Sequence, residues 1–244
     1  MAFDLKGAIV PVLSAGAVRL GVLACAKVFM DFYSVRIDIR FATAPQVADA
    51  VESGQSGVAV VIAPYRAFLG FMRNGRINRS PQHGVGVVRA GVVVRAGAPL
   101  PDLATASSLR TALEQADAVI YNRASSGSQV AGLMERLGLG AAVGGKSVRV
   151  ETGAEVIETV ASGTHGNAIG IAQSTEIRRV IGEGAAAAYA GPLPPELAIE
   201  TYYMAGLVPG MQDRASRFFV RFLGSVKARD ILAAHGVEPL VMLL

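Results

Sequence analysis

Tryptophan is absent from this chain of 244 residues, cysteine occurs once, and aromatic residues make up only 6% of it. With Cys25 alone, no disulfide can form within the chain, and no cysteine metal cluster is expected. The sparse aromatics argue against a stacking platform for single-stranded nucleic acid. The three histidines, His83, His165 and His235, lie far apart and lack the spacing typical of metal ligands. We therefore predict no metal site, no cofactor and no nucleic-acid partner.

Charged residues are also few, at 17%, against 52% hydrophobic residues. This balance supplies enough apolar material for one large domain or two smaller ones. The formal net charge of +4 is compatible with an anionic ligand. No run of like charges occurs, and Lys and Arg do not interleave with aromatic residues as they do in nucleic-acid-binding patches.

The longest apolar stretch, residues 7–26, is interrupted by Pro11 and Arg19. It falls short of a clean membrane span, and we interpret it as a strand, a turn and a helix rather than as a signal peptide. We accordingly expect a cytoplasmic protein if the chain is full length, and a periplasmic one if an export signal has been removed.

Apolar runs and helical periods alternate along the chain, which is typical of an α/β fold with a parallel sheet. Strands are predicted over residues 8–13, 36–41, 57–64, 85–95, 117–120, 147–150, 168–172 and 202–208. Helices are predicted after Thr43 and over residues 17–33, 65–74, 105–115, 130–137, 154–162, 211–223 and 226–235. The pattern changes character near Val85 and Tyr202. We therefore predict two interleaved α/β lobes with a ligand cleft between them: residues 1–84 and 203–244 form lobe 1, and residues 85–202 form lobe 2.

One turn in the second lobe combines several features that suit an anion. A buried strand is followed by Arg123 and by the segment Ser125–Gly127, before a helix predicted from Val130. The N–H groups and the dipole at a helix start attract negative charge, and Arg123 adds a forked cationic donor. The plain alternative is that Ser125 or Ser126 only caps the helix and that Arg123 is a solvated surface charge.

Hydroxyl side chains recur at four predicted strand-to-helix turns. They are Ser14, Thr43, Ser125 with Ser126, and Ser174 with Thr175. A single such turn is ordinarily a helix cap, but four at equivalent positions of a βα pattern favour a shared site. Because ligands of parallel sheets gather beyond the carboxyl ends of the strands, we predict that these turns face one cleft.

The order and spacing of several segments resemble the type 2 periplasmic-binding-protein superfamily, in particular its molybdate-binding-protein-like solute-binding proteins. These segments are Leu13–Ala17, Ala42–Ala44, Ser125–Gly127, Gly170–Glu176 and the closing helices over 218–236. The resemblance covers nearly the whole chain and implies a small anion as ligand, with a membrane transporter as partner if the protein is exported. On this basis we predict the ligand-binding residues Ser14, Ala15, Thr43, Arg123, Ser125, Ser126 and Gln173.

Two residues depart from that resemblance. The molybdate site of the family is typically neutral and has a tyrosine in its last segment, where this chain has Gln173. Arg123 brings a guanidinium, which suits a planar carboxylate at least as well as a tetrahedral oxyanion. We therefore expect a di- or tricarboxylate selected by Arg123. In the alternative, Arg123 faces solvent or pairs with a carboxylate of its own lobe, such as Asp117 or Glu151.

Two functions of different classes follow from these features. The first is a solute-binding protein that encloses a small anion and passes it to a transporter. The second is an isomerase that moves a proton along an unsaturated polycarboxylate, because the Asn-Arg-Ala-Ser turn also resembles aconitate isomerase. An isomerase needs a general base near the substrate carbon. The residues close enough to the turns in sequence are Glu176, Tyr121, Tyr65 and His165, and the sequence does not choose among them.

Overall fold

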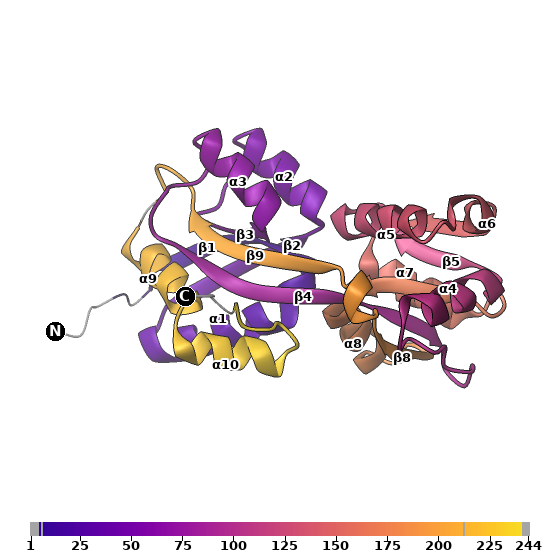
Figure 1. The fold of residues 1–244 in the computed structure, drawn as a ribbon. Coiled ribbons are helices and arrows are strands. Elements are labelled where there is room, and N and C mark those ends of the chain that lie inside the picture. Colours follow the sequence, from indigo (N-terminus) through magenta and orange to yellow (C-terminus); the bar gives the residue numbers. More distant parts are fainter. Residues whose placement is uncertain (1–4, 6, 212, 241–244) are drawn as a thin grey trace. The chain divides into compact units, whose positions relative to one another are not determined.

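The computed structural model describes residue 5 and residues 7–211 and 213–240. The chain divides into two units, drawn in Figure 1. Unit 1 comprises the residues up to Val88 together with those from Thr201 onward, and unit 2 comprises Arg89–Glu200. The boundaries predicted after residues 84 and 202 fall in the same two strands, β4 (Gln82–Arg95) and β9 (Glu200–Leu207), as these divisions. The outer ends of predicted lobe 1, at 1–4 and 241–244, lie outside the described residues.

Unit 1 is built on parallel strands that end at one edge of a sheet. Strand β1 (Ile9–Ala15) lies between β2 (Arg36–Ala42) and β3 (Val60–Pro64) and is parallel to both, while β9 runs antiparallel to β3. Ala15 is opposite Ala42, so β1 and β2 end together. We call the ends of β1, β2 and β3 the carboxyl edge of unit 1.

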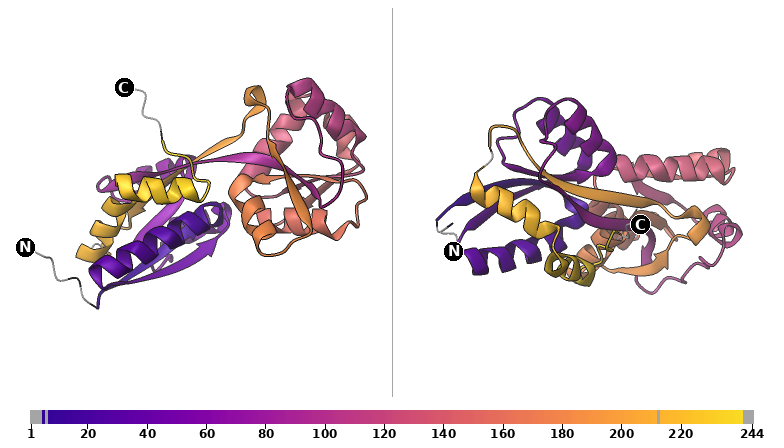
Figure 2. Two further views of the ribbon diagram at one scale, coloured as in Figure 1. Left: turned by 90° about the horizontal axis from the view of Figure 1, so that it is seen from below. Right: turned by 60° about the vertical axis from the view of Figure 1, so that its left-hand side comes forward.

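Helices cover both faces of this sheet, as Figure 2 shows. One face carries α1 (Arg19–Tyr33), α9 (Arg214–Leu223) and α10 (Val226–Ala234), and the other carries α2 (Ala44–Glu52) and α3 (Tyr65–Arg73). Alternate residues of β1 supply the two cores: Val10 and Val12 pack towards α1, and Leu13 packs towards α2 and α3. The first core also takes residues from the end of the chain, among them Phe219 and Leu232.

Unit 2 repeats the arrangement with a second parallel set. Strand β5 (Val119–Asn122) lies between β6 (Ser147–Val150) and β7 (Ile169–Gln173) and is parallel to both. Strand β4 runs antiparallel to β7 and also pairs with β8 (Ala187–Pro192). We call the ends of β5, β6 and β7 the carboxyl edge of unit 2.

The helices of unit 2 fall into two groups. Residues of α4 (Ala106–Gln115), α5 (Ser125–Arg136) and α6 (Gly140–Gly144) enter one core, and residues of α7 (Gly153–Ser162) and α8 (Ser174–Gly182) enter the other. The sequence patterns do not predict α6 or β8, because these two elements are short and rich in alanine and glycine. Helix α8 begins at the predicted strand-to-helix turn of Ser174 and Thr175, although its range is not predicted. Within the described part of the chain, each helix is too short or too polar to span a bilayer.

Candidate functional site

The turn between β5 and α5 is organised by the side chain of Asn122. Its Oδ1 accepts hydrogen bonds from the backbone N–H groups of Ala124, at 3.1 Å, and Gly127, at 3.0 Å. Its Nδ2 lies 3.3 Å from the hydroxyl of Ser126. Asn122 is buried, and these bonds hold the first turn of α5 against the end of the strand that precedes it.

Helix α5 begins at Ser125, five residues earlier than the predicted start at Val130. The Ser-Ser-Gly segment is therefore the first helical turn rather than a loop before it. The residue at the N-cap position is Ala124, which makes no side-chain capping bond, and the Ser126 hydroxyl bonds to the side chain of Asn122 rather than to the helix backbone. The capping role passes to Asn122, because its Oδ1 takes up donors that the helix leaves without intrahelical partners.

Gly127 is required by this arrangement. A Cβ atom at Gly127 would overlap the backbone carbonyl oxygen of Asn122. The close approach of strand and helix thus depends on the absence of a side chain at this position.

Arg123 follows at the carboxyl edge of unit 2, and its side chain is 57% exposed. Its backbone N–H donates to the carbonyl of Val150 at 2.8 Å, which extends the pairing of β5 with β6 by one residue. Its Nε lies 3.0 Å from a carboxylate oxygen of Glu151, which is itself 73% exposed. Of the two pairings weighed from the sequence, Glu151 is therefore the one formed. Asp117 instead accepts from the backbone N–H of Asn167, before the first residue of β5.

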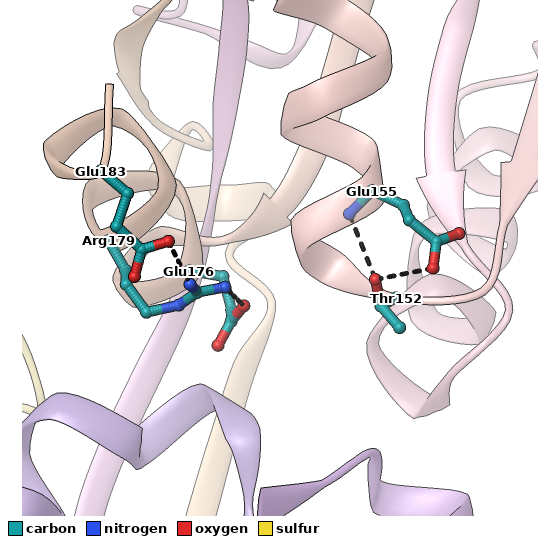
Figure 3. A network of polar contacts seen from close by, with 5 residues as sticks. All are labelled: Thr152, Glu155, Glu176, Arg179 and Glu183. Atoms are coloured by element: carbon teal, nitrogen blue, oxygen red, sulfur yellow. Dashed lines mark hydrogen bonds and ion pairs between the residues drawn. The ribbon is translucent and has the colours of Figure 1, made fainter. Parts of the chain in front are cut away.

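Three helix N-termini meet at this edge, those of α5, α7 and α8. A Cβ atom at Gly153, the first residue of α7, would lie 3.7 Å from Nδ2 of Asn122 and 3.4 Å from Cγ of Glu176. Thr152 caps α7 by accepting from the backbone N–H of Glu155 at 3.1 Å, as drawn in Figure 3. The dipoles of α5, α7 and α8 together favour negative charge at the carboxyl edge of unit 2.

The acidic residue of the first turn of α8, Glu176, is neutralised within its own helix. Its carboxylate lies 3.0 Å from the guanidinium of Arg179, which also contacts Glu183 at 2.6 Å (Figure 3). Glu176 and Arg179 are both mostly buried, and Glu183 is exposed. Glu176 therefore lies near the α5 turn, where a general base would be needed. Its carboxylate, however, belongs to an ion-pair network with Arg179 and Glu183.

The predicted site residues of unit 1, Ser14, Ala15 and Thr43, lie at its carboxyl edge but differ in burial. Ser14 is fully buried within β1, and its hydroxyl donates to the carbonyl of Ala15 at 3.1 Å. That the Ser14 hydroxyl meets a ligand stays a prediction. Ala15 is buried as well. Thr43 caps α2, accepting from the N–H of Gln46 at 3.4 Å, which leaves its hydroxyl hydrogen free to donate.

The remaining predicted residues belong to unit 2. Gln173 ends β7 and is buried, one step along the same edge from Asn122. Ser126 is buried and directed to Asn122. The side chain of Ser125 lies outside what the structure describes.

The other candidates for a general base are scattered. Tyr121 is buried in a core of unit 2, and the guanidinium of Arg149 lies 5.5 Å from its ring centre. Tyr65 begins α3 at the carboxyl edge of unit 1 and is half exposed. His165 precedes β7, which places it near the amino end of that strand. The α5 turn lies at the carboxyl edge, at the other end of the parallel strands of unit 2. Among the residues described, no three His, Cys, Asp or Glu side chains gather to hold a metal ion.

The sequence analysis did not identify Asn122 or Arg19 as site residues. Asn122 was considered only as part of the Asn-Arg-Ala-Ser turn. The available signal was its place at a strand end, because an Asn there is typical of turns in which a side chain bonds to the backbone. Arg19 was considered only as a charged residue that interrupts the apolar stretch 7–26. In the structure it is the first residue of α1 and its guanidinium lies 4.5 Å from the ring centre of Phe41, at the carboxyl edge of unit 1.

Comparison with known proteins places these features in a wider group. A family model described as bacterial extracellular solute-binding protein matches residues 10–238. An aconitate isomerase from Pseudomonas sp is 24% identical over 237 residues, which cover 93% of this chain and 87% of that protein.

Solved structures resemble the fold at lower identity. The periplasmic molybdate-binding protein of Azotobacter vinelandii has a TM-score of 0.75 at 15% identity, over 95% of this chain and all of that one (100%). The sulfate-binding protein SubI of Mycobacterium tuberculosis H37Rv has a TM-score of 0.74 at 14% identity, over 96% of this chain and 87% of that one. These likenesses confirm the α/β fold class predicted from the sequence.

Proposed function

This chain belongs to the bacterial extracellular solute-binding proteins, and from that premise we propose that it binds a small anion with two or three carboxylates. The resemblance to periplasmic binding proteins found in the sequence is thereby confirmed, whereas the choice of a carboxylate is our inference. The observation that carries it is Arg123 beside the first turn of α5. That the two units close on one ligand, as the sequence predicts, stays a prediction.

The turn itself supports an anion as the ligand. Asn122 takes the N–H groups of Ala124 and Gly127, so the backbone N–H groups of residues 125 and 126 are the helix donors assigned to the ligand. Two such donors match two oxygens of one carboxylate or oxyanion. The guanidinium of Arg123 adds a second, planar donor set that favours a carboxylate.

The pair with Glu151 is weak enough for a ligand to replace it. Because both Arg123 and Glu151 are more than half exposed, their ion pair contributes about 0–1 kcal/mol. A charge-assisted hydrogen bond to a ligand carboxylate contributes about 1.5–3 kcal/mol. The balance favours the ligand, with Glu151 holding the guanidinium in place until it arrives.

A titration series tests the proposal. We expect wild-type protein to bind citrate or tricarballylate more tightly than molybdate in isothermal titration calorimetry. Arg123→Lys keeps the charge but loses the planar fork, so its affinity falls, and Arg123→Ala loses about tenfold to a hundredfold. Equal tricarboxylate affinity in all three proteins, or tight molybdate binding by the wild type, would contradict the carboxylate as ligand.

The same proposal extends to where the protein works. Solute-binding proteins deliver their ligands to membrane transporters, and the related structures include components of such transporters. We therefore propose a periplasmic location with a transporter as partner. Fractionation of the native host, with detection of the intact protein in the periplasm or the cytoplasm, decides this point.

A second function, isomerisation of an unsaturated tricarboxylate, is favoured by the relative named aconitate isomerase. Glu176, at the same edge as the α5 turn, is the general base we assign to it. In deuterated water, turnover of aconitate followed by proton NMR would be abolished in Glu176→Gln. Glu183→Gln is the matched control, because Glu183 shares the ion pair with Arg179 but lies on the exposed side. Absence of turnover in wild-type protein would eliminate the isomerase.

A further inference from the structure

Helix α3 of unit 1, labelled in Figure 1, and the segment that follows it carry a group of exposed arginines. The group consists of Arg66, Arg73, Arg76 and Arg79. The stretch from Ser53 to Pro101, in which they lie, contains no aspartate or glutamate. We call these four residues the arginine surface.

The charges of the arginine surface are not neutralised by ion pairs within the described part of the chain. Glu52, the last acidic residue before it in the sequence, accepts from the side chain of Asn74 at 3.0 and 3.2 Å. Unit 1 carries 14 Lys and Arg residues against 8 Asp and Glu, whereas unit 2 carries 9 against 11. The positive net charge of the protein therefore belongs to unit 1.

The packing of α3 leaves this side of the helix open to solvent. Phe68 and Phe71 are buried in the core that unit 1 forms with α2. Arg66 and Arg73 are two helical turns apart, so they lie on one face of α3, opposite the two buried rings. Burial of one face of the helix thus fixes the arginines on the other.

A hollow of about 290 Å³ lies beside Arg73 and Arg79. Leu69 and Met72, both partly exposed, form an apolar wall, and Gln82 lines it as well. The Nε2 of Gln82 donates to the carbonyl of Arg79 at 3.2 Å, which ties this segment to the start of β4. Two guanidinium side chains beside an apolar wall suit an anionic group that is attached to an apolar chain.

We propose that the arginine surface binds the anionic phospholipids of a membrane. A guanidinium forms forked hydrogen bonds with a phosphate group, and the wall of Leu69 and Met72 receives the apolar part of the lipid next to it. Lipid headgroups move laterally, so they can meet four separate arginines. A folded acidic protein would need carboxylates in matching positions, and the described lining of the hollow lacks the large aromatic anchors typical of protein interfaces.

This surface goes beyond the proposed function, because it binds a membrane whether or not Arg123 binds a carboxylate. If both hold, the protein stays close to the membrane in which the proposed transporter lies.

Sedimentation of the protein with lipid vesicles tests the proposal. Vesicles of phosphatidylglycerol and phosphatidylcholine in equal parts are compared with vesicles of phosphatidylcholine alone. Arg73→Gln/Arg79→Gln removes both charges beside the hollow, and Arg73→Lys/Arg79→Lys keeps the charges but loses the forks. Lys227→Gln/Arg229→Gln is the matched control, because it removes the same charge from exposed positions of α10, on the other face of the unit 1 sheet.

We expect wild-type protein to sediment with the phosphatidylglycerol vesicles and not with those of phosphatidylcholine alone. Arg73→Gln/Arg79→Gln should bind about thirtyfold more weakly, because each basic residue near an anionic surface contributes about fivefold. Arg73→Lys/Arg79→Lys should fall between that variant and wild type. The control should bind within about twofold of wild type, since the attraction fades beyond a Debye length. Thermal melting checks that each variant is folded.

Three results would overturn the proposal. One is equal binding by wild type and Arg73→Gln/Arg79→Gln. Another is an equal loss in the control, which would mean that the vesicles respond to net charge alone. The third is binding of wild type to polyglutamate but not to phosphatidylglycerol vesicles, which would assign the surface to an acidic protein. Tricarballylate titration of the same proteins keeps the two proposals apart: vesicle binding without tricarballylate binding contradicts only the proposed function, and the reverse contradicts only the arginine surface.

Discussion

The carboxamide of Asn122 performs two tasks in the α5 turn. Its oxygen accepts from two backbone N–H groups of the α5 turn, and its nitrogen lies beside the hydroxyl of Ser126. Because the group is neutral, it completes the turn without placing negative charge where an anion is proposed to bind. An aspartate would form the same acceptor bonds but carry that charge.

Asn122→Asp therefore separates a cap from an anion site. A negative charge at a helix N-terminus is favourable by about 0.3–1 kcal/mol, so the melting temperature should stay the same or rise. Affinity for the anionic ligand should fall by about tenfold or more, since like charges repel at the site. Calorimetry and thermal melting measure the two effects separately. Unchanged affinity would show that the α5 turn does not contact the ligand.

A companion variant, Asn122→Ala, examines the structural role alone. It leaves the N–H groups of Ala124 and Gly127 without their buried acceptor, which costs about 1–3 kcal/mol. Urea denaturation should show that loss in the free energy of unfolding. A loss well under about 1 kcal/mol would mean that water replaces the carboxamide.

Cys25 gives a prediction about pH. Burial against α10 raises the pKa of its thiol to about 12. Since the folded-state pKa is raised, stability is fully present below the pKa of the unfolded thiol, about 8.5, and is lost as the pH rises towards 12. The free energy of unfolding should fall by about 1.4 kcal/mol per pH unit between about pH 9 and 11. Cys25→Ala, measured by urea denaturation over the same range, should lack that part of the slope.

At the scale of elements, α5 depends on a glycine at one position and only tolerates one at another. Gly127 faces the carbonyl of Asn122, whereas a Cβ at Gly132 would meet no heavy atom within 4 Å. Both lie in the same helix. Comparing the two glycines therefore separates the effect of close contact between β5 and α5 from the effect of helix propensity.

Gly127→Ala and Gly132→Ala should therefore have opposite signs. The first forces β5 and α5 apart and costs about 1–3 kcal/mol or more, because a well-packed contact cannot absorb a methyl group. The second stabilises by about 0.5–1 kcal/mol, because alanine favours the helix over glycine. Urea denaturation of both variants gives the measurement. A stabilising Gly127→Ala would contradict the described geometry of the turn.

At the scale of the whole molecule, the two units differ in continuity. Both cores of unit 2 are formed by residues between Ala90 and Ile199, a single stretch of chain. The larger core of unit 1 combines early residues with Tyr203, Phe219 and Leu232 from the end of the chain. Unit 1 is therefore complete only after the whole chain has been made.

Two fragments test this difference. Residues 89–200 expressed alone should give a far-ultraviolet circular dichroism spectrum of an α/β protein and a cooperative thermal transition. Residues 1–88 alone should not, because they lack β9, α9 and α10, which cover a face and an edge of their sheet. A cooperative transition in the 1–88 fragment, or none in 89–200, would contradict the division of the cores.

Much of the architecture is readable from local pattern. The period of apolar residues predicts the parallel strands and most helices, and the positions where strands end predict where helices begin. β5 is an example: its apolar run identifies it as buried, and the next residues identify a turn to a helix. The family also follows from the order of such turns, since order and spacing are properties of the sequence.

The partners of individual side chains are decided by the tertiary structure alone. The sequence marks Ser14 as a turn hydroxyl, yet the sheet buries it; it marks Arg123 as charged, yet Glu151 of the neighbouring strand end meets it. Arg19 and Phe41 lie on different elements, and only the packing of α1 on β2 brings the cation over the ring. Hydrophobic period is a local property of the chain, whereas hydrogen bonds, burial and ion pairs depend on residues that folding brings together from distant positions.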